Sequence, residues 1–202
     1  MPFSSPSTQR AELRRQLREV RRRLTPAQRS AASLAATTHL LAHPWYRQAR
    51  RIALYWPVGS EVDTTALMAA ALRDRKRVFL PAIVCRGGGL LFVRLRPGIP
   101  LGRRRHGIPQ PRPVRTADVL ACRRLDLVVV PLLGFDDRGH RLGSGAGYYD
   151  RSFAFRPVLP GVRPRLVGLA FAAQQVPQVA AADWDVPLDA VVTENGWQFR
   201  PA

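Results

Sequence analysis

The chain has 202 residues, of which 46% are hydrophobic and 23% charged, and 32 Lys and Arg against 14 Asp and Glu give a formal net charge of +18. This length and composition suit a single α/β domain with a sizeable core. Arg, Pro or Gly interrupts every apolar run before it reaches roughly eighteen residues, which excludes a membrane-spanning helix and predicts a soluble protein.

The positive charge comes almost entirely from arginine, since Lys76 is the only lysine. Such a bias is as easily a habit of genomic base composition as a functional choice. Physically, the excess creates a field that attracts nucleic acid, anionic lipid or small polyanions such as nucleotides and polyglutamates. Charge alone does not choose among these partners.

Residues 1–9 are expected to form a flexible N-terminus before a single domain over residues 10–202. The opening MPFSSPSTQR contains no apolar segment of a secretory signal. Cys85 and Cys122 lack CxxC spacing and a nearby His, which predicts reduced, buried thiols. We therefore expect a cytoplasmic protein. A monomer is also expected, although nothing in the sequence itself decides the oligomeric state.

Two helices are predicted before any strand. Apolar residues recur at helical spacing over Ala11–Arg23, and Thr25-Pro26 is a start signal for a second helix that runs to Leu41. The pattern then alternates: strand 51–56, helix 64–73 and strand 78–82, ended by a turn at Pro81. Strand, helix and strand in this order predict a parallel pair.

Further strands are predicted at 90–95, 125–130, 165–171 and 190–193, and residues 96–115 are expected to form a long surface loop. The run LDLVVV at 125–130 is typical of a strand buried on both faces. The predicted fold is a three-layer α/β/α arrangement with a mostly parallel sheet, preceded by two helices. Ligands of such sheets bind at the carboxyl ends of the strands.

A glycine-rich segment, GHRLGSGAGYYDR, follows the most apolar strand. Gly143, Gly145 and Gly147 let the chain turn sharply with amides directed at one centre, which suits phosphate oxygens, although a turn that binds nothing gives the same spacing. Arg141 and Arg151 add guanidinium groups that can pair with phosphate. In the same segment Asp150 offers hard oxygen ligands for Mg²⁺, and Tyr148 and Tyr149 add flat faces and hydroxyls.

Five blocks of the chain, in order, resemble the 5-formyltetrahydrofolate cyclo-ligase (5,10-methenyltetrahydrofolate synthetase) family. The segment VVVPLLGFDDRGHRLGSGAGYYDR is similar to the family's signature, in which a strand leads to R-L-G-x-G-x-G-Y-Y-D. The other similar blocks are RAELRRQLREVRRRL, IALYWPVGSEVDT, RRRHGIPQP and ADWDVPLDAVVTE.

The resemblance implies a Rossmann-like, NagB-RpiA-CoA transferase-like fold. It also implies closure of 5-formyltetrahydrofolate to the 5,10-methenyl form, with ATP and Mg²⁺ as cofactors and release of ADP and phosphate. Phosphorylation of the formyl oxygen would make it a good leaving group. This chemistry asks mainly for positioning and charge neutralisation. The basic surface is compatible with a polyglutamylated substrate.

The resemblance also implies roles for individual residues. Asp150 and Asp185 would hold Mg²⁺, and Trp56 and Glu61 would form part of the folate pocket. Contacts with ATP would come from Arg10, Arg14, Arg141, Leu142, Gly143, Ser144, Gly145, Ala146, Gly147, Tyr148 and Tyr149, of which Ser144, Gly145, Ala146, Gly147 and Tyr148 would also lie against the folate.

Each of these residues has a plainer interpretation. Trp56 could be a core or rim aromatic, Glu61 could cap the helix that begins near Thr64, and Asp185 could cap a turn before Pro187. The chain also departs from the family pattern, which usually has Lys at position 10 and Glu at position 110, where this chain has Arg10 and Gln110. Ser144 and Ala146 differ from the residues usual there.

Two alternatives to this enzyme remain open. The arginines at 10, 14, 15, 18, 21, 22 and 23 and at 103–105 could belong to a nucleic-acid-binding protein, although no reader motif accompanies them. A paralogue that binds folate without catalysis would keep the same fold. His39, His43, His106 and His140 pair with no evident carboxylate or Cys, and no acid or base is assigned.

Overall fold

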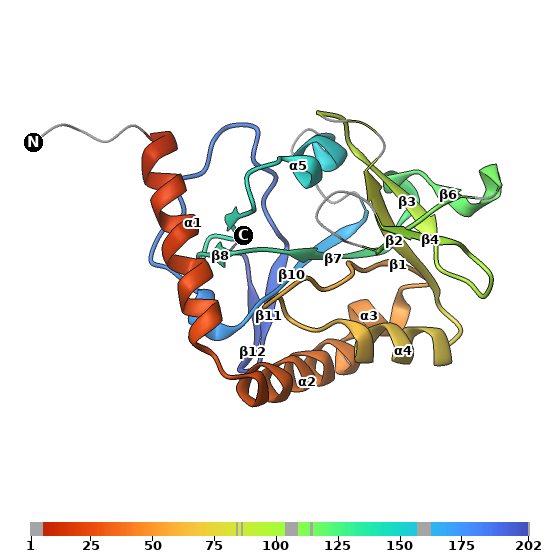
Figure 1. The fold of residues 1–202 in the computed structure, drawn as a ribbon, viewed down its shortest axis with the longest axis horizontal. Helices are drawn as coiled ribbons and strands as arrows, with labels where there is room; N and C mark the ends of the chain where they lie inside the picture. Colours follow the sequence, from red (N-terminus) through yellow and green to blue (C-terminus); the bar gives the residue numbers. More distant parts are fainter. Residues whose placement is uncertain are drawn as a thin grey trace, which may run out of the picture.

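The protein folds around a central β-sheet with helices on two sides (Figure 1). The computed structural model describes residues 6–83, 85, 87–103, 109–113, 115–156 and 163–201. No helix among these residues has the length and apolar character needed to cross a membrane.

Among the described residues, one sheet contains eight strands in the order β12-β11-β10-β7-β1-β2-β3-β6. The central strands β11, β10, β7, β1 and β2 are all parallel, whereas β12, β3 and β6 pair antiparallel at the two edges. The prediction of a mostly parallel sheet is confirmed. The strands are β1 Arg51–Ala53, β2 Arg77–Ile83, β3 Leu90–Arg94, β6 Val119–Leu120, β7 Leu127–Pro131, β10 Arg165–Leu169, β11 Ala190–Thr193 and β12 Gly196–Phe199.

Strand β7 shows why the sheet is covered on both faces. Leu127 and Val129 pack in one core cluster, and Val128 and Val130 pack in the other, as the two-residue period of a strand requires. All four side chains are at most 1% exposed. The run of apolar residues is therefore a consequence of two buried faces, as predicted.

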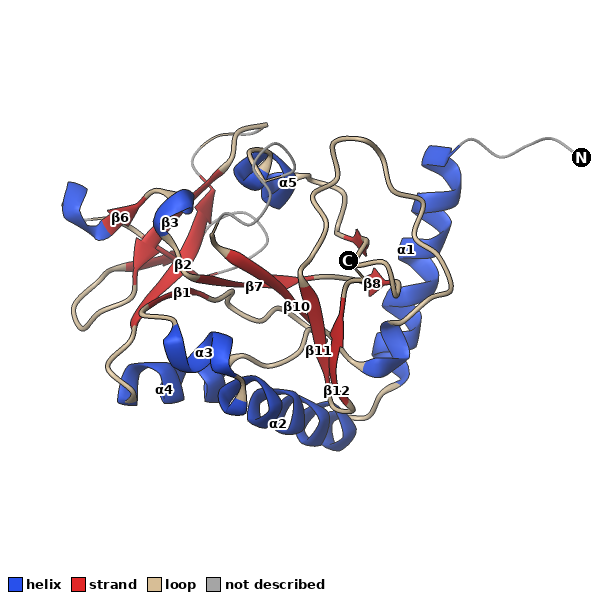
Figure 2. Ribbon diagram, turned by 180° about the vertical axis from the view of Figure 1, so that it is seen from behind, coloured by secondary structure: helices blue, strands red, loops and turns tan. Residues whose placement is uncertain are grey.

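Helices form the two outer layers (Figures 1 and 2). The first core cluster lies between the sheet and α2 (Pro26–Ala42), α3 (Pro44–Gln48) and α4 (Thr65–Arg73), while α5 (Tyr148–Phe153) covers the opposite face. Helix α1 (Pro6–Arg23) stands at the side of the molecule. The three-layer α/β/α prediction is confirmed.

The N-terminal prediction is wrong in part, because α1 begins at Pro6 and residues 6–9 are helical. Pro is well tolerated in the first turn of a helix, where its missing N–H costs no hydrogen bond. Residues 1–5 lie outside the described part of the chain. The short α3 was also missed, because Pro44 reads equally well as the end of α2.

Several strand boundaries differ from the sequence prediction. Strand β2 continues through Pro81, whose missing N–H falls on the side where β1 has already ended, since the last residue of β2 paired with β1 is Phe79. Strand β1 ends at Ala53, and β10 ends at Leu169. The antiparallel edge strand β12 was not predicted, because its sequence GWQF is short and mixed in polarity.

The segment predicted as a long loop contains a two-stranded ladder. Strands β4 (Leu101–Arg103) and β5 (Pro109–Pro111) pair antiparallel there. The ladder was not predicted, because the many Pro and Gly residues of this segment are typical of a loop. A further small ladder joins β8 (Gly134–Phe135) to β9 (Arg141–Leu142) just before the glycine-rich loop.

The two cysteines are free thiols, but the prediction that both are buried is wrong. Cys85 is exposed, because it lies in the turn after β2. Cys122 is half-buried, and its Sγ lies 3.1 Å from the Ser152 carbonyl oxygen, to which it donates. Burial raises the pKa of the Cys122 thiol.

Asp126 joins the amino ends of the central strands. Its Oδ2 accepts from the backbone amides of Arg50 and Arg51 at 3.0 and 2.8 Å, and its Oδ1 accepts from Arg51 Nη2 at 2.8 Å. Burial alone would raise the pKa of this carboxyl, but the Arg51 guanidinium and the two amides outweigh it and lower the pKa to about 2. The ionised side chain therefore stabilises the start of β1.

We expect Asp126→Asn to lower the free energy of unfolding at pH 7 by about 2 kcal/mol, because the ionised carboxyl is favoured in the folded state. A pKa lowered in the folded state gives stability that is fully present above the unfolded pKa and is lost as pH falls through the folded value. The deficit of the variant should thus shrink between about pH 4 and pH 2. Urea unfolding of both proteins across this range measures it, and a deficit that stays constant contradicts the assignment.

Candidate functional site

A cavity of about 990 Å³ lies at the carboxyl ends of the central strands. Tyr55 and Trp56 follow β1 there, Leu80 and Pro81 belong to the end of β2, and residues 131–133 close β7. The remaining wall comes from α1, the glycine-rich loop, α5 and the segment around Asp185. Segments from both ends of the chain meet at this cavity.

The strand order explains the position of the cavity. From β1 the chain moves to β2 on one side, whereas β7, β10 and β11 follow on the other side. Loops leaving β1 and β7 therefore diverge and leave a crevice between them, which is where open parallel sheets bind ligands. The sequence-based expectation of a site at the carboxyl ends is consistent with this geometry.

Two arginines hold the glycine-rich loop by its carbonyl groups. Arg14 Nε donates to the Gly143 oxygen at 3.0 Å, and Arg151 Nη2 donates to the Ala146 oxygen at 2.7 Å. Gly145 has a φ of +105° and Gly147 a φ of +65°, conformations that favour glycine.

The loop amides, in contrast to its carbonyls, are available. Within the described part of the chain, no acceptor bonds the backbone N–H of any residue from Ser144 to Gly147. Several adjacent free amides beside a cluster of arginines form a suitable cradle for phosphate oxygens. Ser144, Gly145 and Ala146 are exposed, so their amides are open to a ligand.

The two candidate metal ligands lie close together in the cavity wall. Asp150 Oδ1 accepts from Arg141 Nη2 at 2.5 Å and from the amide of Val186 at 3.1 Å, which places it beside Asp185. Asp185 Oδ2 accepts from Arg10 Nη2 at 2.7 Å and from the amide of Ala182 at 2.9 Å. Asp185 thus caps its own turn, as the plainer interpretation suggested, and also pairs with α1.

These residues fit a magnesium ion. The described residues contain no group of three His, Cys, Asp or Glu side chains that could hold a metal ion by themselves. Mg²⁺ in nucleotide sites, however, commonly uses one or two carboxylates together with phosphate oxygens and water. Hydrogen bonds within the described residues engage Asp150 Oδ1 and Asp185 Oδ2, and leave the other oxygen of each carboxylate open.

Arg141 and Leu142 are more buried than the loop that follows them. The Arg141 side chain is 5% exposed and bonds Asp150 and the Val186 carbonyl oxygen. Its clearest role in the structure is to orient Asp150. The Leu142 side chain packs in a small core with Leu17 and Leu133, so only its backbone faces the loop.

Also in the cavity wall, Glu61 accepts from the Val58 amide at 3.0 Å. The expectation that Glu61 could cap α4 is wrong, because Thr64 is the N-cap of that helix. Burial raises the pKa of Glu61, although the Val58 amide and the charge of Arg21 oppose the rise. Half-buried Trp56 packs against the core, as its plainer interpretation suggested. It also lines the cavity, and its contact with a folate stays a prediction.

Tyr149 lies close enough to Glu61 for the two to interact electrostatically. Burial raises the pKa of the Tyr149 hydroxyl, and the Glu61 carboxylate adds to the effect. The same holds for Tyr55, whose hydroxyl donates to the Val62 carbonyl oxygen at 3.0 Å. Glu61 is therefore surrounded by two neutral phenols and one guanidinium.

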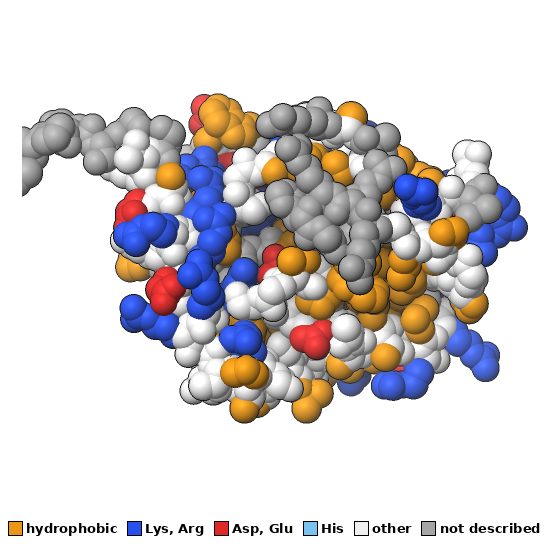
Figure 3. Space-filling view, viewed as in Figure 1, with side chains coloured by type: hydrophobic (Ala, Val, Ile, Leu, Met, Phe, Trp, Pro, Cys, Tyr) orange, Lys and Arg blue, Asp and Glu red, His pale blue; other side chains and the backbone are white. Residues whose placement is uncertain are grey.

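Helix α1 presents one face of arginines to the cavity. Figure 3 shows basic side chains gathered in a row along α1. On the outer side, Arg15 and Arg22 pair with Glu12 and Glu19. The lining residues, at helical spacing, are Arg10, Arg14, Arg18 and Arg21.

Sequence reasoning assigned Arg10 and Arg14 to the site but missed Arg18 and Arg21. The signal was present, since positions 10, 14, 18 and 21 fall on one helical face. The basic helix that suggested nucleic-acid binding thus turns much of its charge inward. The Arg103 side chain and residues 104–108, which include His106, lie outside what the structure describes.

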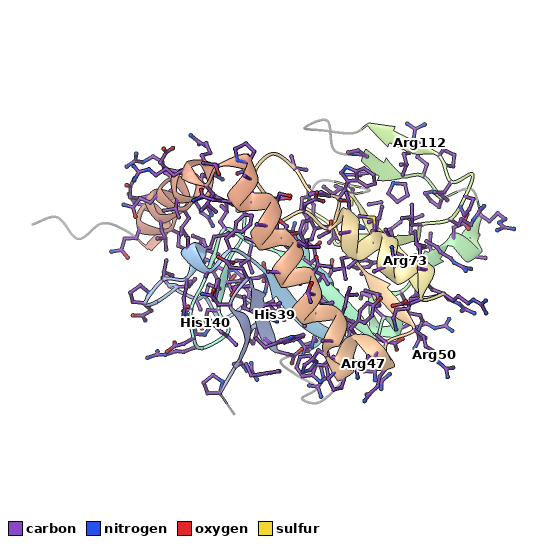
Figure 4. The ribbon with its side chains drawn as sticks, turned by 90° about the horizontal axis from the view of Figure 1, so that it is seen from below. His39, Arg47, Arg50, Arg73, Arg112 and His140 are labelled. Carbon is purple, nitrogen blue, oxygen red and sulfur yellow. The ribbon has the colours of Figure 1, made fainter. Side chains whose placement is uncertain are left out.

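Other basic residues and the histidines lie away from this cavity. In Figure 4 Arg47, Arg50, Arg73 and Arg112 lie toward one side of the view and His140 toward the other. His140 Nδ1 lies 3.0 Å from Asp136 Oδ2, and His39 Nε2 lies 3.2 Å from the Glu194 carbonyl oxygen. None of these six residues lines the cavity.

Comparison with known proteins assigns the chain to a family. The family model described as the 5-formyltetrahydrofolate cyclo-ligase family matches residues 6–194. The chain belongs to this family.

Relatives and solved structures agree with the assignment. A 5-formyltetrahydrofolate cyclo-ligase of Haemophilus influenzae is 36% identical over 89% of this chain and 94% of its own, and one of Escherichia coli K12 is 35% identical over 91% and 100%. The 5,10-methenyltetrahydrofolate synthetase structure of Aquifex aeolicus superposes with a TM-score of 0.80 at 30% identity, covering 96% of this chain and 93% of that one.

The departures from the cyclo-ligase pattern are accommodated in the structure. Gln110, 6% exposed, lines the cavity and accepts from the Ile83 amide through Oε1 at 3.2 Å, a bond that either an amide or a carboxylate can make. Ser144 and Ala146 lie at the exposed rim, where the loop is held through its backbone. Arg10 forms the ion pair with Asp185.

Gly145→Ala should lower the free energy of unfolding by about 1 kcal/mol, because an L side chain is strained at a φ of +105°. Gly143→Ala is the matched control, since a Cβ at that position has open space and the residue has no positive φ. Urea unfolding of both variants measures the difference. Equal stability of the two variants would contradict the loop conformation described here.

Proposed function

We propose that the protein is an ATP- and Mg²⁺-dependent enzyme that closes 5-formyltetrahydrofolate to 5,10-methenyltetrahydrofolate and releases ADP and phosphate. The observation that carries the proposal is the meeting, in one cavity, of free loop amides, arginines, two adjacent carboxylates and the Glu61 pocket. These groups suit the phosphates, the metal and the folate of a single reaction. The names of the relatives support the same substrate.

The reaction has two steps. The formyl oxygen attacks the γ-phosphorus, the bond to the bridging oxygen breaks, and its electron pair leaves with ADP. The folate nitrogen next to the formylated one then attacks the carbon that carries the phosphorylated oxygen. The bond between this carbon and that oxygen breaks, and phosphate departs as the attacking nitrogen loses its proton. Neither step needs a protein nucleophile, so the protein contributes positioning and charge neutralisation.

At the nucleotide end, the amides from Ser144 to Gly147 would bind phosphate oxygens, with Arg10 and Arg14 beside them. The Nε of Arg10 is buried and has no partner among the described residues, and a phosphate oxygen would supply one. In our proposal the flanking residues of the same segment, Arg141 to Gly143 at one end and Tyr148 and Tyr149 at the other, keep these amides in position around the phosphates. Arg141 does so through Asp150.

Asp150 and Asp185 would hold the metal ion, which, when bound, neutralises charge on the phosphates. Their partners Arg141 and Arg10 fix the direction of each carboxylate before any ligand arrives. Each carboxylate is also bonded to a backbone amide of the same segment. The two side chains are thus preorganised, which lowers the cost of ordering them on binding.

At the folate end, Glu61 would accept hydrogen bonds from the donor edge of the pterin, and Trp56 would pack against a ring. Ser144 to Tyr148 would border the same substrate from the opposite wall. We further propose that the chain works as a single domain that includes the whole of α1, as a monomer in the cytoplasm. The excess of 32 Lys and Arg over 14 Asp and Glu gives the protein a positive field, which is compatible with binding of a negatively charged polyglutamate tail on the substrate.

The alternatives are supported less well. A nucleic-acid-binding surface would need its arginines outward, whereas four arginines of α1 line the cavity. A paralogue without catalysis would have no use for two adjacent carboxylates held by arginines. The nucleic-acid alternative uses none of the groups that the cavity brings together, and the paralogue would use only those at the folate end.

The proposal is tested by incubating the purified protein with 5-formyltetrahydrofolate, Mg²⁺ and ATP and following the absorbance of the conjugated methenyl product. We expect turnover that requires all three. Product formation without ATP, or none with it, would overturn the proposal. Submicromolar binding of nucleic acid at physiological salt, without competition from ATP, would favour the alternative.

Asp150→Asn should lower kcat by at least about 100-fold while the variant remains folded, because a neutral amide is a poor ligand for Mg²⁺. The Mg²⁺ concentration for half-maximal rate should rise. Asp183→Asn is the matched control, since Asp183 is an exposed carboxylate of the same segment and does not line the cavity. Unchanged Mg²⁺ dependence in Asp150→Asn removes the metal role.

Glu61→Gln should raise the KM for the folate by about tenfold or more, because the amide accepts hydrogen bonds less strongly than a carboxylate. The pKa of Glu61 is raised, so the wild-type carboxylate is protonated on acidification sooner than an ordinary Glu. Folate affinity of the wild type should therefore fall as pH decreases through this raised pKa. The pH profile of kcat/KM measures the effect, and Glu61→Gln should lack that acid limb.

A further inference from the structure

Arg18 differs from the other cation side chains of the cavity. Six arginines of the described residues line this cavity. Five of them are bonded to the protein: Arg10 to Asp185, Arg14 to Gly143, Arg21 to Ser60, Arg141 to Asp150 and Val186, and Arg151 to Gly88 and Ala146. For Arg18 the described residues supply no hydrogen bond and no ion pair.

The neighbours of Arg18 on α1 repel it. Burial lowers the pKa of Arg14, and the charges of Arg10 and Arg18 lower it further. Burial also lowers the pKa of Arg21, and Arg18 adds to that effect while Glu61 opposes it. An unpaired, half-buried guanidinium between two others is electrostatically unfavourable until an anion joins the cluster.

The position of Arg18 indicates which anion would join the cluster. Arg14, one turn before Arg18, contacts the Gly143 carbonyl of the glycine-rich loop. Arg21, about one turn after it, donates to Ser60 Oγ at 3.0 Å, next to Glu61. Arg18 therefore lies between the end of the cavity assigned to the nucleotide phosphates and the end assigned to the folate.

We propose that Arg18 is a catalytic residue that contacts the phosphoryl group while it passes from ATP to the formyl oxygen. The inference rests on the proposed function, in which that group must cross from the loop to the folate. Negative charge is spread over its equatorial oxygens as the bond to ADP breaks and the bond to the formyl oxygen forms. A guanidinium with no other partner can direct several N–H groups at those oxygens without giving up an existing bond.

The competing source of negative charge is a carboxylate of the folate's glutamate tail. The two sources predict different kinetics. A contact made with the phosphoryl group in transfer acts on kcat, whereas a contact with a tail carboxylate acts on the KM for the folate, and more so with a polyglutamate.

The test is Arg18→Gln, assayed with monoglutamyl and polyglutamyl 5-formyltetrahydrofolate. Gln is a good helix former, so α1 should be retained. We expect kcat to fall by about 100-fold with both substrates, as for loss of other transition-state donors, with each KM changed by less than about threefold. The rate of ADP formation in a single turnover, measured by rapid quench, should fall by the same factor.

A control separates this role from a structural one. Because Arg18 is repelled by its neighbours, Arg18→Gln should leave the Tm unchanged or raise it, whereas loss of a structural contact would lower the Tm. Arg15→Gln removes a guanidinium from the outer face of the same helix, where it bonds only Glu12 among the described residues, and should keep the wild-type kcat.

Three outcomes overturn the inference: an unchanged kcat, an effect confined to the KM of the folate, or a fall in kcat that accompanies a lowered Tm. The wild type is assayed first. If it forms no methenyl product, the proposed function itself fails. If the wild type is active and Arg18→Gln matches it, only the role of Arg18 is lost.

Discussion

The attachment of α1 to residues far along the chain is the constraint on which the site depends. Arg10 pairs with Asp185 at 2.7 Å across 175 positions of sequence, and Arg14 reaches Gly143 at 3.0 Å across 129. Without α1 the cavity would lose one wall, and the glycine-rich loop would lose a bond that holds its carbonyl. The first helix of the chain therefore completes a site whose other parts belong to the sheet.

Close packing between Leu17 of α1 and the residues around β8 and β9 sets the distance between α1 and the rest of the domain. Leu17 is 3% exposed and belongs to the small core with Leu133 and Leu142. A Cβ on Gly134 would come within 2.4 Å of Leu17 Cδ1, so a larger residue there would force the Leu17 side chain to move from its place in this core. The position of the α1 arginines at the cavity thus depends on how Leu17 packs in this small core.

The sequence allowed prediction of the parallel sheet, and all the predicted site residues except Leu142 line the cavity, because both rest on local patterns. Buried strands such as β7 show as apolar runs, and the glycine-rich segment has an unusual composition. The edge strand β12 and the β4–β5 ladder could not be predicted, since their pairing depends on partners distant in sequence. The course of β2 through Pro81 depends likewise on where β1 ends. That Arg141 holds Asp150, or that Arg18 lacks a partner, is decided only by tertiary contacts.

The departure at position 10 has a physical interpretation in the same contacts. An ammonium is a compact point charge, whereas a guanidinium has donors in several directions. Arg10 uses Nη2 for Asp185 and keeps a buried Nε without a partner among the described residues. Arg14 uses Nε for Gly143, and no hydrogen bond from its two Nη groups is found in the described part of the chain. Each can therefore hold the protein and meet a phosphate at once. The arginine bias of the chain, whatever its origin, gives this cavity cations that both support the site and bind in it.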